Sequence, residues 1–120
     1  MIAILDWELS TLGDPCADFN YHCLQYIMNP KLADKDYCRN QGIPVIDEYV
    51  KMYSEKINVD LTEEWDLYSA YNLFKLAGIL QGILGRVRDG TAAHENAAER
   101  ASGVRNLSDK AWDLVKKNFL

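Results

Sequence analysis

The sequence lacks a concentrated positive charge and a long hydrophobic run. Its longest basic run is Lys116-Lys117 and its formal net charge is −5, which argues against the basic surface that nucleic-acid binding needs. The longest charge-free apolar stretch of the later chain, 76–85, is half of what spanning a bilayer requires. Residues 1–5 are too short, and lack the basic region, to be a signal peptide. We therefore expect a soluble protein that binds neither nucleic acid nor membrane.

Cysteine is also scarce. The three cysteines, Cys16, Cys23 and Cys38, are odd in number and lack Cys-x-x-Cys spacing. A disulfide framework is therefore not expected, and a reducing cytoplasm fits best. Together with His22 they could form a zinc set, but the spacing matches no standard site. We expect them to be small buried hydrophobic side chains instead.

The acidic residues are unevenly placed in a chain that is otherwise typical of one domain. With 120 residues, 48% of them hydrophobic, the chain can bury a core. Asp6, Glu8, Asp14 and Asp18 all precede the first basic residue, Lys31. Such a cluster of carboxylates is costly unless it is solvated, capped or metal-bound. Solvated loop acids with one helix cap are the simpler alternative to a metal site.

The hydrophobic periodicity predicts one short strand and about five helices. Residues 2–5 are apolar and partly β-branched, which indicates a strand buried on both faces. Its pairing partner is not identifiable in the sequence. Residues 29–43 are predicted to be an irregular connection. The predicted helices cover 14–28, 44–57, 62–88, 91–102 and a final segment starting at Asn106 or Ser108.

Several residues mark the ends of these helices. Asp14 and Pro15 predict a helix start, because Asp can cap free N–H groups and Pro is favoured at the first helical position. Asp60 or Thr62 is expected to cap the longest helix, and Gly90 to end it in the left-handed conformation. Within that helix, Gly78 and Gly82 lie on one face and predict the close approach of another backbone.

Two segments carry a specific resemblance to a known family. Residues 5–19, LDWELSTLGDPCADF, resemble the metal-binding segment of the aminoglycoside phosphotransferase and choline-kinase-like family, in particular its branch associated with acyl-CoA dehydrogenase-like proteins. Residues 74–82, FKLAGILQG, with Arg86 and Asp89-Gly90 beyond them, resemble the long C-terminal helix of that branch. The resemblance covers essentially the whole chain.

The resemblance implies a fold and a metal ligand. Members of this family are built like protein kinases, so residues 1–120 would be the mainly α-helical C-lobe subdomain of such a phosphotransferase. Asp6 matches the aspartate that ligates the Mg²⁺ ions bridging the ATP phosphates, and Mg²⁺ prefers such oxygen ligands. Glu8 is a weaker candidate for the same site. Asp14 matches a helix-start position, and Asp18 matches an Asp that braces the catalytic loop.

Other parts of the family's machinery are not found in this sequence. The family carries a His-Gly-Asp…Asn loop before the strand that ends in Asp6, and neither His22 nor His94 is followed by Gly-Asp. No phosphate-covering Gly-rich loop and no N-lobe lysine can be named. We therefore expect the chain to be a C-terminal fragment with no catalytic residue, no assignable cofactor-binding residue and no tight binding of Mg²⁺ or ATP.

Two functions follow as alternatives. The first is the C-terminal part of an enzyme that transfers the γ-phosphoryl group of ATP to a small-molecule hydroxyl, inactive as this chain alone. The second is a non-catalytic helical module that forms a homo-oligomer through its unpaired strand. The aromatic residues Trp65, Tyr68, Tyr71 and Phe74 could line a substrate cleft, but their helical spacing favours a core. The substrate cannot be read, although an acidic C-lobe suits cationic substrates.

Overall fold

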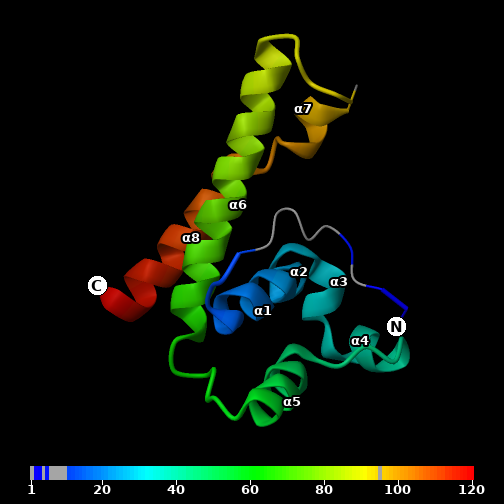
Figure 1. Ribbon diagram of the computed structural model, residues 1–120, viewed down its shortest axis with the longest axis vertical. Coiled ribbons are helices and arrows are strands. Elements are labelled where there is room, and N and C mark those ends of the chain that lie inside the picture. The colour runs from blue at the N-terminus through cyan, green and yellow to red at the C-terminus, as the bar shows by residue number, and fades with distance from the viewer. Residues whose placement is uncertain (1, 4, 6–10, 95) are drawn as a thin grey trace.

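The structure, a computed structural model, describes residues 2–3, 5, 11–94 and 96–120 (Figure 1). Its regular structure over these residues is helical, which confirms the predicted mainly-α class. The helices are α1 (Pro15–Cys23), α2 (Gln25–Met28), α3 (Pro30–Ala33), α4 (Lys35–Asn40), α5 (Ile46–Ile57), α6 (Trp65–Arg88), α7 (Ala97–Arg100) and α8 (Val104–Phe119).

The predicted N-terminal strand is not found in the described residues. Ile2, Ala3 and Leu5 have no regular secondary structure, and all three are exposed to solvent. A strand needs a neighbour to satisfy its backbone hydrogen bonds, and no strand occurs elsewhere in the described chain. The expectation of a strand buried on both faces is therefore wrong for these three residues.

The first predicted helix is present but interrupted. Asp14 caps α1, and Pro15 occupies its first position, as the sequence predicts. The helix closes at Leu24, whose N–H donates to the Tyr21 carbonyl three residues back, and α2 resumes one residue later. Leu24 keeps right-handed helical dihedrals, so the tightened turn redirects the chain without opening a loop.

The expected irregular connection at 29–43 contains two short helices. Asn29 caps α3, where its side-chain oxygen accepts from the Lys31 N–H. Asp34 caps α4 and accepts from the N–H groups of Asp36 and Tyr37. Side-chain caps of this kind satisfy the free donors of a single turn, which explains how helices this short form between prolines and glycine.

Helices α5 and α6 end as the sequence predicts, but α6 begins differently. Asn58 ends α5 in the left-handed conformation with φ of 54°, and Gly90 follows α6 with φ of 70°. Asp60 does not cap α6: its carboxylate accepts from the N–H and the hydroxyl of Thr62. Glu64 takes the cap position, but its side chain accepts no capping hydrogen bond from the first N–H groups of α6.

The helix bounds in the last part of the chain differ from the predicted ones. The expected helix at 91–102 is reduced to α7, a single turn. The final helix, α8, begins at Val104 and therefore earlier than the predicted Asn106 or Ser108. Gly103 occupies the cap position of α8, and its carbonyl accepts from the Leu107 N–H.

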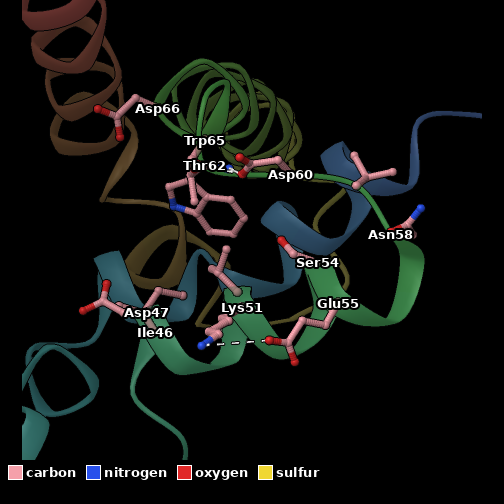
Figure 2. Close-up of a pocket in the computed structure, with 12 residues that line it drawn as sticks. Ile46, Asp47, Lys51, Ser54, Glu55, Asn58, Asp60, Thr62, Trp65 and Asp66 are labelled. Atoms are coloured by element: carbon pink, nitrogen blue, oxygen red, sulfur yellow. Dashed lines mark hydrogen bonds and ion pairs between the residues drawn. The ribbon is translucent and has the colours of Figure 1, made fainter.

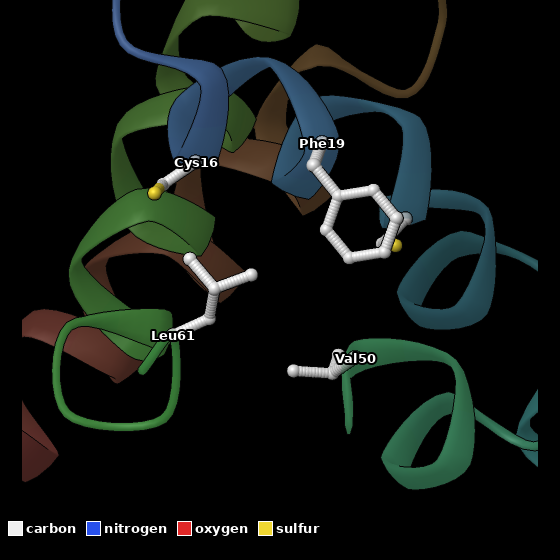
Figure 3. Packing of buried hydrophobic residues seen from close by; sticks show 5 residues of the cluster. Cys16, Phe19, Val50 and Leu61 are labelled. Atoms are coloured by element: carbon white, nitrogen blue, oxygen red, sulfur yellow. The ribbon is translucent and has the colours of Figure 1, made fainter. Parts of the chain in front are cut away.

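The buried side chains form two hydrophobic clusters. One joins α1 to α5 and to the start of α6, and Figure 3 shows its side chains converging from these elements. It includes a stacked pair, Phe19 and Tyr53, with ring centroids 3.9 Å apart. The second cluster joins α6 to α8 and consists of Leu24, Leu73, Ala77, Leu107 and Ala111.

The cysteines belong to this interior, as predicted. Cys16, Cys23 and Cys38 are buried free thiols, and burial raises the pKa of Cys23 to about 12. A thiol with a raised pKa is a poor nucleophile and a poor metal ligand at neutral pH. None of the helices in the described ranges is both long and apolar enough to cross a membrane.

Replacing Leu73 tests the packing of α6 on α8. Leu73 is completely buried, so Leu73→Ala leaves a cavity and is expected to lower the free energy of unfolding by about 2–5 kcal/mol. The matched control is Leu12→Ala, because Leu12 is fully exposed, and it should change stability by less than about 0.5 kcal/mol. Urea unfolding monitored by circular dichroism measures both. Equal effects would contradict the described core.

Candidate functional site

The start of α1 is the part of the family-like segment that the structure describes. Asp14 adopts an extended conformation, and its Oδ1 accepts from the Cys16 N–H at 2.8 Å. Asp18 lies one turn further on and is exposed; its N–H donates to the Asp14 carbonyl at 3.2 Å. The predicted metal ligands Asp6 and Glu8 lie outside the described residues.

Tyr68 of α6 ties the Asp14 cap to the opposite helix. Its hydroxyl lies 2.7 Å from Asp14 Oδ2 and 3.1 Å from Glu64 Oε2. One hydroxyl proton serves one carboxylate at a time, so Tyr68 is shared between the two acids. Its hydrogen bond is the main cause that lowers the pKa of Asp14, and the same bond raises the pKa of Tyr68. Asp14 therefore stays ionised at neutral pH.

A buried polar network holds α1 against α6. The Asn20 side-chain N–H₂ donates to Ser69 Oγ at 2.9 Å and to the Trp65 carbonyl at 3.3 Å. The Asn72 side-chain N–H₂ donates to Asn20 Oδ1 at 3.0 Å and to the Ala17 carbonyl at 2.8 Å. Asn20 and Asn72 are each 1% exposed. Because buried amides without partners are costly, these bonds set how α1 sits along α6.

Sequence reasoning missed most of this network. The sequence patterns gave no hydrogen-bonding role to Asn20, Ser69 or Asn72. The available signal was spacing: Asn20 follows Cys16 by four positions and precedes Cys23 by three, so it lies on the same buried face of α1. The partners of Asn20 lie some 50 positions away in the chain, so no local sequence pattern specifies which residues they are.

A groove lies between α5 and the start of α6. Its volume is about 850 Å³, and Figure 2 shows Trp65 facing α5 across it. The Lys51 ammonium pairs with Glu55 at 3.9 Å across one turn of α5. Ser54 Oγ is buried there and makes no hydrogen bond within the described chain. The groove is lined by Ile46, Asp47, Val50, Lys51, Ser54, Glu55, Asn58, Val59, Asp60, Thr62, Trp65 and Asp66.

The chemistry of this groove is that of an apolar floor with an acidic rim. Four of its lining residues are acidic and one is basic, and Asp47 is already paired with Lys35 at 2.9 Å. An indole face beside carboxylates is suited to an organic cation, which it attracts through cation–π and charge interactions. Over the described residues no group of three His, Cys, Asp or Glu side chains could hold a metal ion.

The four aromatic residues considered as a cleft separate in the structure. Trp65 lines the groove, and Tyr68 packs against the cluster around Phe19 while binding Asp14. Tyr71 and Phe74 are exposed on another side of α6. The expectation that helical spacing buries them is therefore correct in part for Trp65 and Tyr68, and wrong for the other two.

This arrangement defines a helical domain in which α1 is capped by Asp14 and anchored to α6. Comparisons with known proteins identify homologues of the chain. The chain is 36% identical over 122 residues to mouse acyl-CoA dehydrogenase family member 10. It is 32% identical over 123 residues to human acyl-CoA dehydrogenase family member 11. It is 34% identical over 125 residues to a probable acyl-CoA dehydrogenase, IBR3, of Arabidopsis thaliana.

These similarities extend over nearly the whole chain but over little of each relative. They cover 98%, 99% and 97% of this chain, and 11%, 16% and 14% of the three relatives. The chain thus has acyl-CoA dehydrogenase family members as homologues and spans between about a tenth and a sixth of their length. No protein-family model matches the sequence. No solved structure matches it either.

Replacing Asn72 tests the buried network. Asn72→Ala removes both donors and leaves the Asn20 and Ala17 acceptors buried without them, so we expect a loss of about 1–3 kcal/mol in the free energy of unfolding. Asn106→Ala is the matched control, because Asn106 is exposed on α8, and it should change stability by less than about 0.5 kcal/mol. Chemical denaturation measures the free energy of unfolding of both variants. An equal loss of stability in the two would contradict the described network.

The Tyr68–Asp14 bond predicts a pH-dependent difference in stability. The lowered pKa of Asp14 means that the bond stabilises the fold above the unfolded-state pKa, about 3.9, and that this contribution is lost as pH falls through the folded-state pKa. Wild type should therefore exceed Tyr68→Phe in stability at neutral pH, and the gap should close in acid.

Urea unfolding from neutral to acidic pH measures this gap. Tyr71→Phe serves as control, because Tyr71 is exposed on the same helix, and it should show no comparable change with pH. A gap for Tyr68→Phe that stayed constant down to the lowest pH would contradict the role given to Asp14.

Proposed function

We propose that the chain is the C-terminal helical part of an ATP-dependent small-molecule phosphotransferase, and that Asp6 is its Mg²⁺ ligand. The observation that carries the proposal is the segment 5–19, in which an apolar stretch ends in Asp6-Trp7-Glu8 and is followed by Gly-Asp-Pro and Asp18. The all-helical architecture of the described residues agrees with the C-lobe subdomain that this resemblance implies.

The geometry around Asp14 supports the same reading. In the family-like segment Asp14 belongs to a helix start and Asp6 to a metal site, so the helix must be fixed for the preceding residues to be positioned. Asp14 is held by the Cys16 N–H and by the Tyr68 hydroxyl, and α1 is fixed to α6 by Asn20 and Asn72. Asp18 is exposed one turn along, where it can contact a neighbouring catalytic loop.

The homologues support this proposal because they carry the name of the family branch that the sequence resembles. The segment 5–19 resembles the branch of the phosphotransferase family associated with acyl-CoA dehydrogenase-like proteins, and the relatives found are acyl-CoA dehydrogenase family members. Mg²⁺ and ATP would be the cofactors of the complete enzyme, and a substrate hydroxyl would accept the γ-phosphoryl group. The buried free thiols suit a reducing compartment, and we propose the cytoplasm.

Phosphoryl transfer needs several parts at once. Catalysis rests on positioning the nucleotide, the metal ions and the attacking hydroxyl together. One or two carboxylates without phosphate oxygens hold Mg²⁺ poorly, because the ion retains its waters. We therefore propose that this chain alone binds the metal weakly through Asp6 and does not turn over ATP.

Replacing Asp6 tests the metal assignment. Mn²⁺, as a paramagnetic substitute for Mg²⁺, should broaden the NMR signals of residues close to Asp6, and Asp6→Asn should remove the effect because it removes a charged oxygen ligand. Asp109→Asn, at an exposed position of α8, should leave the broadening unchanged. Broadening that persists in Asp6→Asn would contradict the assignment.

An ATP hydrolysis and transfer assay on the same samples tests the second part of the proposal. We expect no turnover from the chain alone with Mg²⁺ and ATP. Turnover at the rates of ordinary kinases, about 1–100 per second, would contradict the proposal, because it would show that catalysis does not need the family's catalytic loop and nucleotide lobe. The two results are independent, because metal binding can be retained without activity.

A further inference from the structure

One side of the α6–α8 pair is apolar and uncovered. Leu67, Tyr71 and Phe74 follow one another by four and three positions on α6, so they form one stripe, and each is 46–58% exposed. On α8, Trp112 and Phe119 are seven positions apart and are also about half exposed. Monomeric proteins rarely leave a large contiguous apolar area in water.

These residues face the same direction, away from α1 and α2. Asn72 reaches Ala17 of α1, and Phe74, two positions later, is turned by about 200°. Lys110 of α8 donates to the Ile27 carbonyl of α2, and Trp112, two positions after Lys110, is likewise turned by about 200°. Both helices, which lie side by side (Figure 1), therefore contribute to one free face.

Glycines continue this face towards the C-terminal end of α6. A Cβ added at Gly78 or Gly85 would meet no atom within 4 Å, and at Gly82 it would meet only the Arg86 guanidinium, at 3.9 Å. Each glycine costs about 1 kcal/mol relative to Ala inside a helix. Nothing in the described chain uses the room that they leave, so the close approach predicted from the sequence is not made within one copy.

We propose that a second copy of this chain docks on this face, with the two α6 helices antiparallel and crossing at Gly78. The large and small residues of the stripe are spaced symmetrically about that position. In this register Phe74 lies opposite the partner's Gly82, four residues from the crossing on either side. Tyr71 lies opposite the partner's Gly85, seven residues from it. Such self-complementarity is what a two-fold interface requires.

The charges along α6 favour the same arrangement. Glu63, Glu64 and Asp66 lie at its N-terminal end, and Arg86 and Arg88 in its last turn. Antiparallel pairing brings the acidic end of each helix towards the basic end of its partner and also opposes the helix dipoles. A parallel pair would bring like charges together. A second copy therefore matches the face in both size and charge.

The interface differs from the self-association expected through the N-terminal strand, since Ile2, Ala3 and Leu5 belong to no strand. It is tested first by sedimentation velocity of the whole chain over a range of concentrations. We expect a dimer, whose dissociation constant Phe74→Ala raises at least tenfold because it removes a central aromatic contact. The matched control is Ile79→Ala: Ile79 is 46% exposed like Phe74 but lies off the stripe, and should have no effect.

A second variant separates loss of docking from loss of folding. Gly82→Leu fills the hollow that would receive Phe74, while Leu is a better helix former than Gly. We expect this variant to be monomeric and at least as helical as wild type by circular dichroism. A Gly82→Leu chain that dimerised as tightly as wild type would overturn the proposal.

Crosslinking tests the register directly. Two copies of Gly78→Cys would meet at the crossing and form a disulfide on mild oxidation, because the Cα atoms come within the range that a disulfide spans. Gly85→Cys is the control: two such residues would be about 21 Å apart along the helices and should not crosslink. The native cysteines are buried and do not compete.

The outcomes are decisive in both directions. A concentration-dependent dimer that is weakened by Phe74→Ala, abolished by Gly82→Leu and trapped by Gly78→Cys supports the proposal. A monomer at every concentration overturns it and leaves the face to a segment of a longer polypeptide. A dimer that is insensitive to both stripe variants, or that is trapped equally by Gly85→Cys, overturns it as well.

Discussion

The hydrogen bonds of two buried amides, Asn20 and Asn72, are the constraint on which the rest of the structure depends. Each amide is enclosed between α1 and α6, and each has its donors satisfied by a named acceptor. A hydrophobic contact can slide with little change in energy, whereas a buried amide that moves by one turn loses its partners. These bonds therefore fix α1 along α6, and the apolar clusters on either side complete the packing around that position.

The position of α1 in turn determines where Asp14 lies in the fold. With Asn20 held, Asp14 is brought against Tyr68, and its carboxylate is used to cap α1 and to bind α6. Both carboxylate oxygens of Asp14 are thus engaged in holding α1 in place. This agrees with a division of labour in which Asp14 fixes the helix and Asp6, eight residues earlier, carries the proposed Mg²⁺ chemistry.

Local patterns in the sequence predicted the longer elements well. The start of α1 follows from Pro15, and the ends of α5 and α6 follow from Asn58 and Gly90, because proline and left-handed residues restrict the backbone whatever surrounds it. The short helices α3 and α4 were missed since each depends on one capping side chain, at Asn29 and Asp34, within a stretch that otherwise reads as a loop.

Features that depend on distant partners were not predictable in the same way. The hydrophobic pattern places Trp65 and Phe74 in one apolar helix, but it does not predict which of the two side chains a neighbouring helix buries. That depends on where α1 and α8 dock on α6. The predicted strand at 2–5 was inferred from composition alone, and the described residues there have no partner to pair with. The assignments of Asp6 and Glu8 lie outside the described residues and rest on the sequence.

The geometry of α6 makes the proposed function and the proposed dimer compatible. One helix has three flanks: α1 covers the side of Asn72, α8 covers the side of Leu73 and Ala77, and the side of Phe74 is uncovered. Asp14 lies on the α1 side, where it binds Tyr68, so a second copy on the Phe74 side would leave that contact uncovered. A helix that is apolar on most sides and carries glycines on the remaining one is best explained by a further packing partner, since α1, α7 and α8 of the described chain leave the Phe74 side exposed.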